Sequence, residues 1–189
     1  MDDIKDKLRK HIEKIISLSD EEISTICEHF TFQEFKKKEL IFEEGQLVKH
    51  VYFVLSGLVV LSYTDRDAKQ HLISFAMEDW WETDFVAFYS KSRSTLALKC
   101  IENTKMLCLS LDHFEKLCAT IQKMEHFFLK KSIAGHIGSQ QRILSFLTSS
   151  AKQRYEHMIT NHPAWVQRIP KSMLASYLGV SRETLSRIL

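Results

Sequence analysis

The stretch that decides the fold of this chain is PKSMLASYLGVSRETLSRIL, residues 170–189. Residues 171–178 favour a first helix, and Gly179 supplies the positive φ that a turn between two steeply crossing helices needs. Ser181 is a preferred N-cap for a second helix. The order helix, glycine turn and capped helix predicts a helix-turn-helix. The apolar positions expected to pack its two helices together are Met173, Leu174, Leu178, Leu185, Ile188 and Leu189.

The second helix of this motif leaves a polar face outward. Arginine can donate two hydrogen bonds to guanine, and glutamate can accept one from cytosine. Recognition helices read bases with their N-terminal residues, here Arg182 and Glu183, and Arg187 lies about one turn further along the same side. A solvated helix with no DNA role is the alternative, but cap, glycine, core spacing and polar face together favour DNA. The candidate DNA-binding residues, including phosphate contacts, are Lys171, Ser172, Ser181, Arg182, Glu183, Thr184, Ser186 and Arg187.

The composition is that of an ordinary folded protein of one or two domains. The chain has 189 residues, an apolar fraction of 44% and a formal net charge of only +2, so no global field demands a nucleic-acid or membrane partner. The basic excess is local, because residues 161–189 carry four Lys and Arg against one acidic residue. Cysteines at 27, 100, 108 and 118 form no C-x-x-C pair, which predicts reduced, buried thiols and no metal site.

The N-terminal two thirds changes character along its length. Spacings of three and four predict a helix over residues 2–17, and a Ser19–Glu22 capping box predicts a second one over 20–29. Short segments between Phe30 and Ser110, punctuated by Gly45 and Gly57, favour strands and predict a small β-roll. An insert over 78–89 interrupts the strands and is expected to hold a short helix.

A long helix is predicted over residues 121–147, spanning about 40 Å. Its apolar residues cover more than one face, and one β-roll hides only one of them, so the other invites a partner. A parallel homodimer seam is favoured over burial within the monomer. A further helix is expected over 149–159, and Pro163 and Pro170 mark a linker and a helix start.

These motifs together resemble the cyclic-nucleotide-receptor, or catabolite activator protein, family of transcription regulators. The run Val180-Ser181-Arg182-Glu183-Thr184-Leu185-Ser186-Arg187 is similar to the family's recognition helix, and Phe42–Gly45 with Val51–Gly57 resembles the glycine-marked turns of its β-roll. Trp80-Trp81, 151–155 and 175–179 resemble the branch common in Bacteroidetes. The resemblance implies that Arg182, Glu183 and Arg187 read bases, and that a dimer binds a palindromic operator.

The ligand cassette departs from the family pattern. Cyclic-nucleotide binders hold the phosphate with close backbone N–H groups, a helix N-terminus and an arginine. The family reads Gly-Glu-Leu and, further on, Arg-Ser or Arg-Thr, with the glutamate on the ribose. Here Thr83 and Asp84 stand at the Gly and Glu positions, and Arg93 and Ser94 match the second pair. These four are the candidate ligand-binding residues, with a surface role for Arg93 as the alternative.

The long helix offers a second check on the ligand. An ungapped alignment puts Phe127 and Phe128 where cyclic AMP binders of the family place hydroxyls for the adenine. Phenylalanine makes no such bonds, so the ligand is predicted not to be cyclic AMP. Core packing is favoured over ligand stacking for Trp80 and Trp81. Cys27 alone does not supply the cysteine cluster of the family's oxygen sensors, and His71 or His113 as a haem ligand has no motif behind it.

The sequence therefore predicts an α+β chain with a cyclic-nucleotide-binding-like β-roll (residues 1–120), a long dimerisation helix (121–147) and a winged-helix-type helix-turn-helix (148–189). The expected function is a homodimeric, sequence-specific transcription regulator that senses a small molecule of unknown identity. The alternative is a small-molecule-binding module with a non-functional DNA head. No enzyme motif is present, and no cofactor is expected to be required.

The expected partners are double-stranded DNA and a second copy, with RNA polymerase as a further candidate. The acidic start Met1-Asp2-Asp3 resembles no signal peptide, and no apolar stretch is long enough to span a bilayer, so a cytoplasmic protein is expected. Relatives usually continue past the recognition helix, some with a β-wing. An end at Leu189 would remove phosphate contacts and lower DNA affinity.

Overall fold

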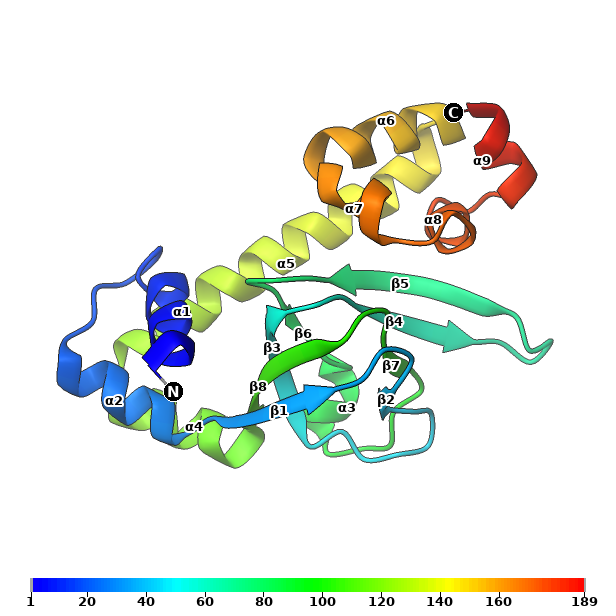
Figure 1. Cartoon of the computed structure of the whole chain (residues 1–189). Helices are drawn as coiled ribbons and strands as arrows, with labels where there is room; N and C mark the ends of the chain where they lie inside the picture. Colours follow the sequence, from blue (N-terminus) through cyan, green and yellow to red (C-terminus); the bar gives the residue numbers. More distant parts are fainter. Residues whose placement is uncertain (1, 189) are drawn as a thin grey trace. The chain divides into compact units, whose positions relative to one another are not determined.

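The fold was analysed in a computed structural model, which describes residues 2–188. It divides into two compact units. The first comprises the chain up to Leu61 together with Phe75–Ser132, and the second comprises Ser62–Ser74 together with the chain from Ile133 onward. Helices and strands are mixed, as predicted (Figure 1).

The β-roll consists of two four-stranded sheets with the orders β1-β8-β3-β6 and β2-β7-β4-β5. Strand β8 lies between β1 and β3 and pairs antiparallel with both, with Cys108 opposite Thr31 on one side and Tyr52 on the other. Alternating apolar side chains from the strands fill the interior. The strands are β1 (Thr31–Phe35), β2 (Leu40–Phe42), β3 (His50–Ser56), β4 (Val59–Thr64), β5 (Gln70–Ala76), β6 (Trp81–Glu82), β7 (Ala97–Cys100) and β8 (Thr104–Ser110).

Two glycines make the turns that the sequence indicated. Gly45 and Gly57 both have positive φ, +85° and +107°. A Cβ on Gly57 would lie 2.7 Å from the backbone oxygen of Asn103, so the turn between β3 and β4 excludes any larger residue. The insert predicted over 78–89 contains β6 and the short helix α3 (Phe85–Ser90).

The helices of the first unit are α1 (Asp2–Ile12), α2 (Asp20–Glu28), α3 and α4 (Leu111–Thr120), followed by the start of α5. The predicted capping box is confirmed, because Ser19 Oγ accepts from the backbone of Glu22 and the Glu22 carboxylate accepts from the backbone of Ser19. The first helix is shorter than the predicted 2–17. Its hydrogen bonding ends in a turn after Ile12, and Ile15 and Ile16 pack against the core from that turn.

Helix α5 covers Lys123–Thr148, close to the predicted 121–147. It begins later because Ile121 is the C-cap of α4. Its apolar side chains after residue 128 remain largely exposed, from Leu129 (57%) and Ile133 (45%) to Leu147 (77%).

The second unit contains the rest of α5, α6 (Ala151–Asn161), α7 (Pro163–Arg168), α8 (Lys171–Tyr177) and α9 (Arg182–Ile188). The predicted linker between the two prolines is wrong, because Pro163 starts α7. Proline suits the first turn of a helix, where the missing N–H would have no partner. Buried Trp165 anchors α7 and packs against Tyr177. Leu189, predicted to lie on the inner face of the last helix, is outside the described residues.

Candidate nucleic-acid interface

The turn between α8 and α9 is closed by a Schellman motif. The N–H of Val180 donates to the carbonyl of Ala175, and the N–H of Gly179 donates to that of Ser176. Gly179 has φ +70°, and a Cβ there would lie 2.8 Å from Cε1 of Phe146 on α5. Both the backbone conformation and this close approach therefore require glycine, as the sequence indicated.

Helix α9 begins as predicted at Ser181. Its hydroxyl accepts a hydrogen bond from the N–H of Thr184 at 3.1 Å, and its carbonyl accepts from Leu185. Leu185 is 1% exposed, Leu174, Ala175 and Leu178 are also buried, and α9 is in contact with α8. The cap and the buried Leu185 together fix which face of the helix points outward.

The outward face of α9 carries Arg182, Glu183, Ser186 and Arg187, all exposed. Hydrogen bonds from its own backbone N–H and from Ser181, with the charges of Arg182 and Arg187 nearby, lower the pKa of Glu183 below its usual range. The carboxylate is thus an ionised acceptor at neutral pH, and the arginines beside it are donors. One face of the helix therefore presents both hydrogen-bond donors and a hydrogen-bond acceptor.

The other predicted contacts differ in exposure. Lys171 and Ser172 are exposed at the start of α8, and Ser181 is exposed at the start of α9. Thr184 is half-buried, and its hydroxyl lies 3.1 Å from that of Ser181. Thr184 therefore helps to hold the cap, and its side chain has less access to an outside ligand than the other seven.

Two arginines that the sequence analysis did not identify donate hydrogen bonds to the carbonyls that precede Gly179. Arg154 on α6 donates to the carbonyl of Leu178 through Nε (3.1 Å) and Nη2 (2.9 Å). Arg142 on α5 donates to the carbonyl of Tyr177 at 3.2 Å. The guanidinium carbon of each lies 5.0 Å from the ring centroid of Phe146. The one signal for this contact in the sequence is that Arg142 and Phe146 lie one helical turn apart near the end of the long helix.

The cassette, residues 81–95 of the first unit, differs from this interface because three of its four candidate ligand-binding residues are buried. Asp84 caps α3, where one carboxylate oxygen accepts from the N–H of Ala87 and the other from the hydroxyl of Ser94 at 2.7 Å. The Thr83 hydroxyl donates to the carbonyl of His50. Thr83, Asp84 and Ser94 are 1%, 4% and 2% exposed. Of the four candidates only Arg93 is exposed, and it donates to the carbonyl of Gly45.

Trp81 lies beside the cassette in an aromatic cluster. Its indole N–H donates to Nε2 of His11 at 3.1 Å, and its ring packs against Phe53, Phe127 and Phe128. His11 is 2% exposed, and burial with nearby Lys131 lowers its pKa to about 4. Trp81 is thus partly buried and packs against the core, as favoured, whereas the same prediction is wrong for Trp80, which is 36% exposed. Phe127 is fully buried in the same cluster.

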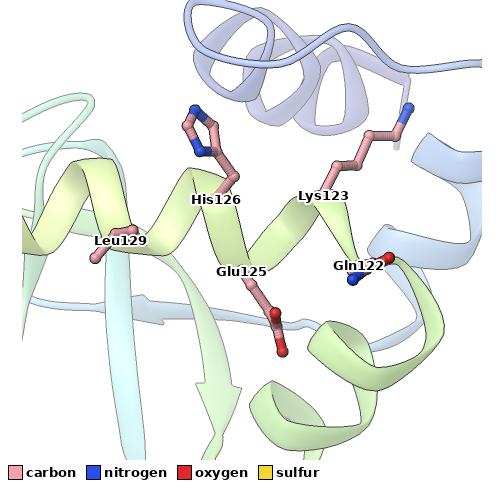
Figure 2. A pocket seen from close by; sticks show the side chains of 5 residues that line it. All are labelled: Gln122, Lys123, Glu125, His126 and Leu129. Atoms are coloured by element: carbon pink, nitrogen blue, oxygen red, sulfur yellow. The ribbon is translucent and has the colours of Figure 1, made fainter.

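An open depression of about 540 Å³ lies along the start of α5, lined by Gln122, Lys123, Glu125, His126 and Leu129. Figure 2 shows Lys123 and His126 on one side of the helix and Glu125 on the other. Lys123 already pairs with Glu22 at 2.6 Å. Because these side chains do not converge, the depression offers no built ligand site.

Metal and thiol chemistry find no support in the described part of the chain. Among residues 2–188, no group of three or more His, Cys, Asp or Glu is placed to hold a metal ion. The four cysteines are free, and burial raises the pKa of the Cys100 and Cys118 thiols to about 11. Cys27 is half-buried. No helix among these residues is long and apolar enough to cross a membrane.

Comparison with known proteins defines the class. Residues 32–121 match the family model of the cyclic nucleotide-binding domain. Among curated proteins, no sequence matches the chain. Solved structures match up to 90% of it, so the chain has the fold of the catabolite activator protein.

Three of these structures illustrate the likeness. The catabolite activator protein of Thermus thermophilus is 20% identical, with a TM-score of 0.58 over 90% of this chain and 82% of that one. FixK2 of Bradyrhizobium japonicum is 17% identical (TM-score 0.72; 84% and 82% covered). CLP of Xanthomonas campestris, a c-di-GMP-responsive regulator, is 15% identical (TM-score 0.71; 90% of each covered).

The segment 32–121 is therefore similar to the cyclic nucleotide-binding domain, and the whole chain has the fold of the catabolite activator protein. The resemblance and the fold class predicted from the sequence are confirmed. The Bacteroidetes-like branch, the domain boundaries and the individual site residues stay predictions, and the β-wing would lie beyond the described residues.

Proposed function

We propose that this protein is a sequence-specific, DNA-binding transcription regulator that acts as a homodimer and whose β-roll responds to a small molecule other than cyclic AMP. The observation that carries the proposal is the exposed polar face of α9. Arg182, Glu183 and Arg187 lie on the free side of a helix whose other side is anchored by Leu185.

The chemistry of this face suits the edges of bases in the major groove. Arg182 and Arg187 would each donate to guanine O6 and N7, and ionised Glu183 would accept from cytosine N4. Lys171 and Ser172 at the start of α8 would contact phosphates and fix the position of α9. The proposal thus assigns base reading to α9 and positioning to α8.

A second copy of the chain is the proposed partner along α5. Ile133, Ile137, Leu144 and Leu147 are all at least 45% exposed, and they recur at the spacing of one helix face. Gly135 and Gly138 have no atom within 4 Å of an added Cβ, but they lie about 140–200° around the helix from Ile133, outside this apolar face. Pairing of two such helices would place two α9 helices on one DNA site and predicts a palindromic operator.

The cassette argues against a cyclic nucleotide as the effector. A nucleotide phosphate at this place would need the N–H groups at the start of α3 and the Ser94 hydroxyl, but the Asp84 carboxylate already accepts from Ala87 N–H and from Ser94. The carboxylate would also repel a phosphate. The residues present therefore do not fit a cyclic nucleotide.

The test is selection of preferred sites from a random duplex library by the wild-type protein and by Arg182→Ala and Glu183→Ala variants, at a stated salt concentration. We expect the wild type to recover a two-fold palindrome. Each substitution should relax preference at one base position by about 1–3 kcal/mol. Lys37→Ala, at an exposed position between β1 and β2, is the control and should leave the site unchanged.

Two outcomes would contradict the proposal. Unchanged sequence preference in both α9 variants would remove the base-reading role. Tight binding of cyclic AMP or cyclic GMP by calorimetry, without DNA binding in any condition, would favour a small-molecule-binding module with a non-functional DNA head.

A further inference from the structure

The side chain of Arg142 lies between two separate segments of the second unit. Its Nη2 donates to the carbonyl of Leu72 at 3.0 Å and to the carbonyl of Tyr177 at 3.2 Å. Its guanidinium carbon lies 3.6 Å from the centroid of the Tyr177 ring. Leu72 lies on β5 in the hairpin segment, residues 62–74, which contains the end of β4, the turn and most of β5. Tyr177 ends the first helix of the helix-turn-helix. One guanidinium thus contacts both.

Arg142 is held by carbonyl oxygens and ring faces instead of a carboxylate. Within residues 2–188, no Asp or Glu forms an ion pair with it, and burial lowers the pKa of its guanidinium. A buried charge is costly unless its hydrogen bonds are made. Loss of either carbonyl contact therefore leaves a poorly solvated cation, so the two contacts stabilise the same arrangement of hairpin segment and helix-turn-helix.

Arg154 provides an internal comparison. It also approaches Phe146, and it also donates to the turn, at Leu178, with its remaining hydrogen bond to Ser149. All these partners lie in the C-terminal helices. Arg154 therefore stabilises the helix-turn-helix alone, whereas Arg142 additionally contacts the hairpin segment.

We propose that Arg142 is a positioning residue that couples the hairpin segment 62–74 to the helix-turn-helix. This inference rests on the proposed function. Strands β4 and β5 continue from this segment into Val59–Leu61 and Phe75–Ala76 of the β-roll. A displacement of these strands would move the Leu72 carbonyl. Because the same guanidinium bonds to the Tyr177 carbonyl and stacks on its ring, Tyr177 and the turn before α9 would then move as well. Lysine cannot replace it, because an ammonium lacks the planar fork that stacks and donates together.

Hydrogen exchange followed by mass spectrometry tests the coupling on the full chain without DNA. In Arg142→Met, amides of both 70–74 and 176–180 should exchange at least about tenfold faster than in the wild type, about 1.4 kcal/mol of local opening. In the matched control Arg154→Met, only 176–180 should respond. Faster exchange at 176–180 with unchanged exchange at 70–74 in Arg142→Met would overturn the proposal.

Two further variants keep the test decisive. If Arg142→Met unfolds the second unit, Arg142→Lys retains a cation and much of the stem, and it should still accelerate exchange in both segments. Leu72→Ala, at a position 5% exposed, perturbs the hairpin segment from the other side. It should accelerate exchange at 176–180 in the wild type but add nothing in the Arg142→Lys background. Strictly additive effects would overturn the coupling.

The exchange result separates this inference from the DNA-binding proposal. Coupled exchange with no recovered operator would retain the role of Arg142 and contradict the proposed function. If the protein recovers an operator but the two segments exchange independently, the proposed function is retained and the role of Arg142 is contradicted.

Discussion

Helices α9 and α3 both begin with a polar cap, yet the residues around the two caps face different surroundings. Ser181 caps α9, and the next residues, Arg182 and Glu183, remain exposed. Asp84 caps α3, but its second carboxylate oxygen accepts a hydrogen bond from the hydroxyl of Ser94, and both residues are buried. The outward positions of α3 are apolar, with Phe85 48% and Val86 77% exposed.

The contrast shows where an outside polar ligand can act. On α9 the Ser181 cap and the Glu183 carboxylate bond to the start of the helix, and the side chains of Arg182 and Arg187 stay exposed. In the cassette, Asp84 and Ser94 bond to each other and connect the start of α3 to the residues before β7. The same capping chemistry thus serves recognition in one unit and internal stability in the other, and the following predictions test that division from the largest expected effect to the smallest.

Gly179→Val should be the most damaging change. It forces a β-branched residue to φ +70° and places its Cβ 2.8 Å from the Phe146 ring, so the local free energy of unfolding of 171–188 should fall by about 3–4 kcal/mol. Hydrogen exchange of that segment measures the loss. Gly135→Ala, where an added Cβ meets nothing, is the control and should stabilise α5 by up to about 1 kcal/mol. Equal effects of both would show that the turn geometry is not restrictive.

Acid should destabilise the first unit through His11. Its pKa is about 4 in the fold, so the unfolded state binds the proton first as the pH falls below about 6.5. Stability is fully present above that pH and should be lost progressively down to about pH 4, by about 3 kcal/mol. Urea unfolding at a series of pH values measures this.

His11→Gln is the matched control for the acid effect. Its amide oxygen can still accept from the Trp81 indole, but it does not titrate. This variant should lose most of the acid dependence, while Lys14, Lys131 and Asp79, which also act on His11, remain. An unchanged pH profile would show that the stability loss arises elsewhere.

Asp84→Ala should cost about 2 kcal/mol, because it removes the cap of α3 and the acceptor of the Ser94 hydroxyl. A double-mutant cycle with Ser94→Ala should give a coupling energy of at least about 0.5 kcal/mol. Cyclic AMP or cyclic GMP should raise the melting temperature of neither protein. A nucleotide-dependent rise in the wild type would show that the cassette opens to a ligand.

Lys171→Ala should have the smallest effect. As a phosphate contact, Lys171 should weaken binding equally at all sequences and reduce the slope of log affinity against log salt by about 1. Titration of the selected duplex and a scrambled duplex over a salt series measures both slopes. A loss confined to the selected duplex would instead make Lys171 a base-reading residue.

Much of the interface was predictable because its rules are local. Gly179, Ser181 and Leu185 act within one turn of their own positions, so spacing alone indicated the turn, the cap and the inner face. The Ser19–Glu22 capping box was predictable for the same reason. The helix over 163–168 is not predicted from the sequence, because Pro163 is typical of a linker as well as of a first helical turn.

The contacts that bring distant residues together were not predictable. Asp84 and Ser94 were named as separate candidates, but nothing local shows that they bind each other, and Arg142 was not named because its two carbonyl partners lie 70 and 35 positions away. The period of the side chains thus determined the helices, the strands and the polar face of α9. The tertiary structure decided which polar groups stay free, because hydrogen bonds between segments far apart in the sequence depend on where the folded backbone places their donors and acceptors.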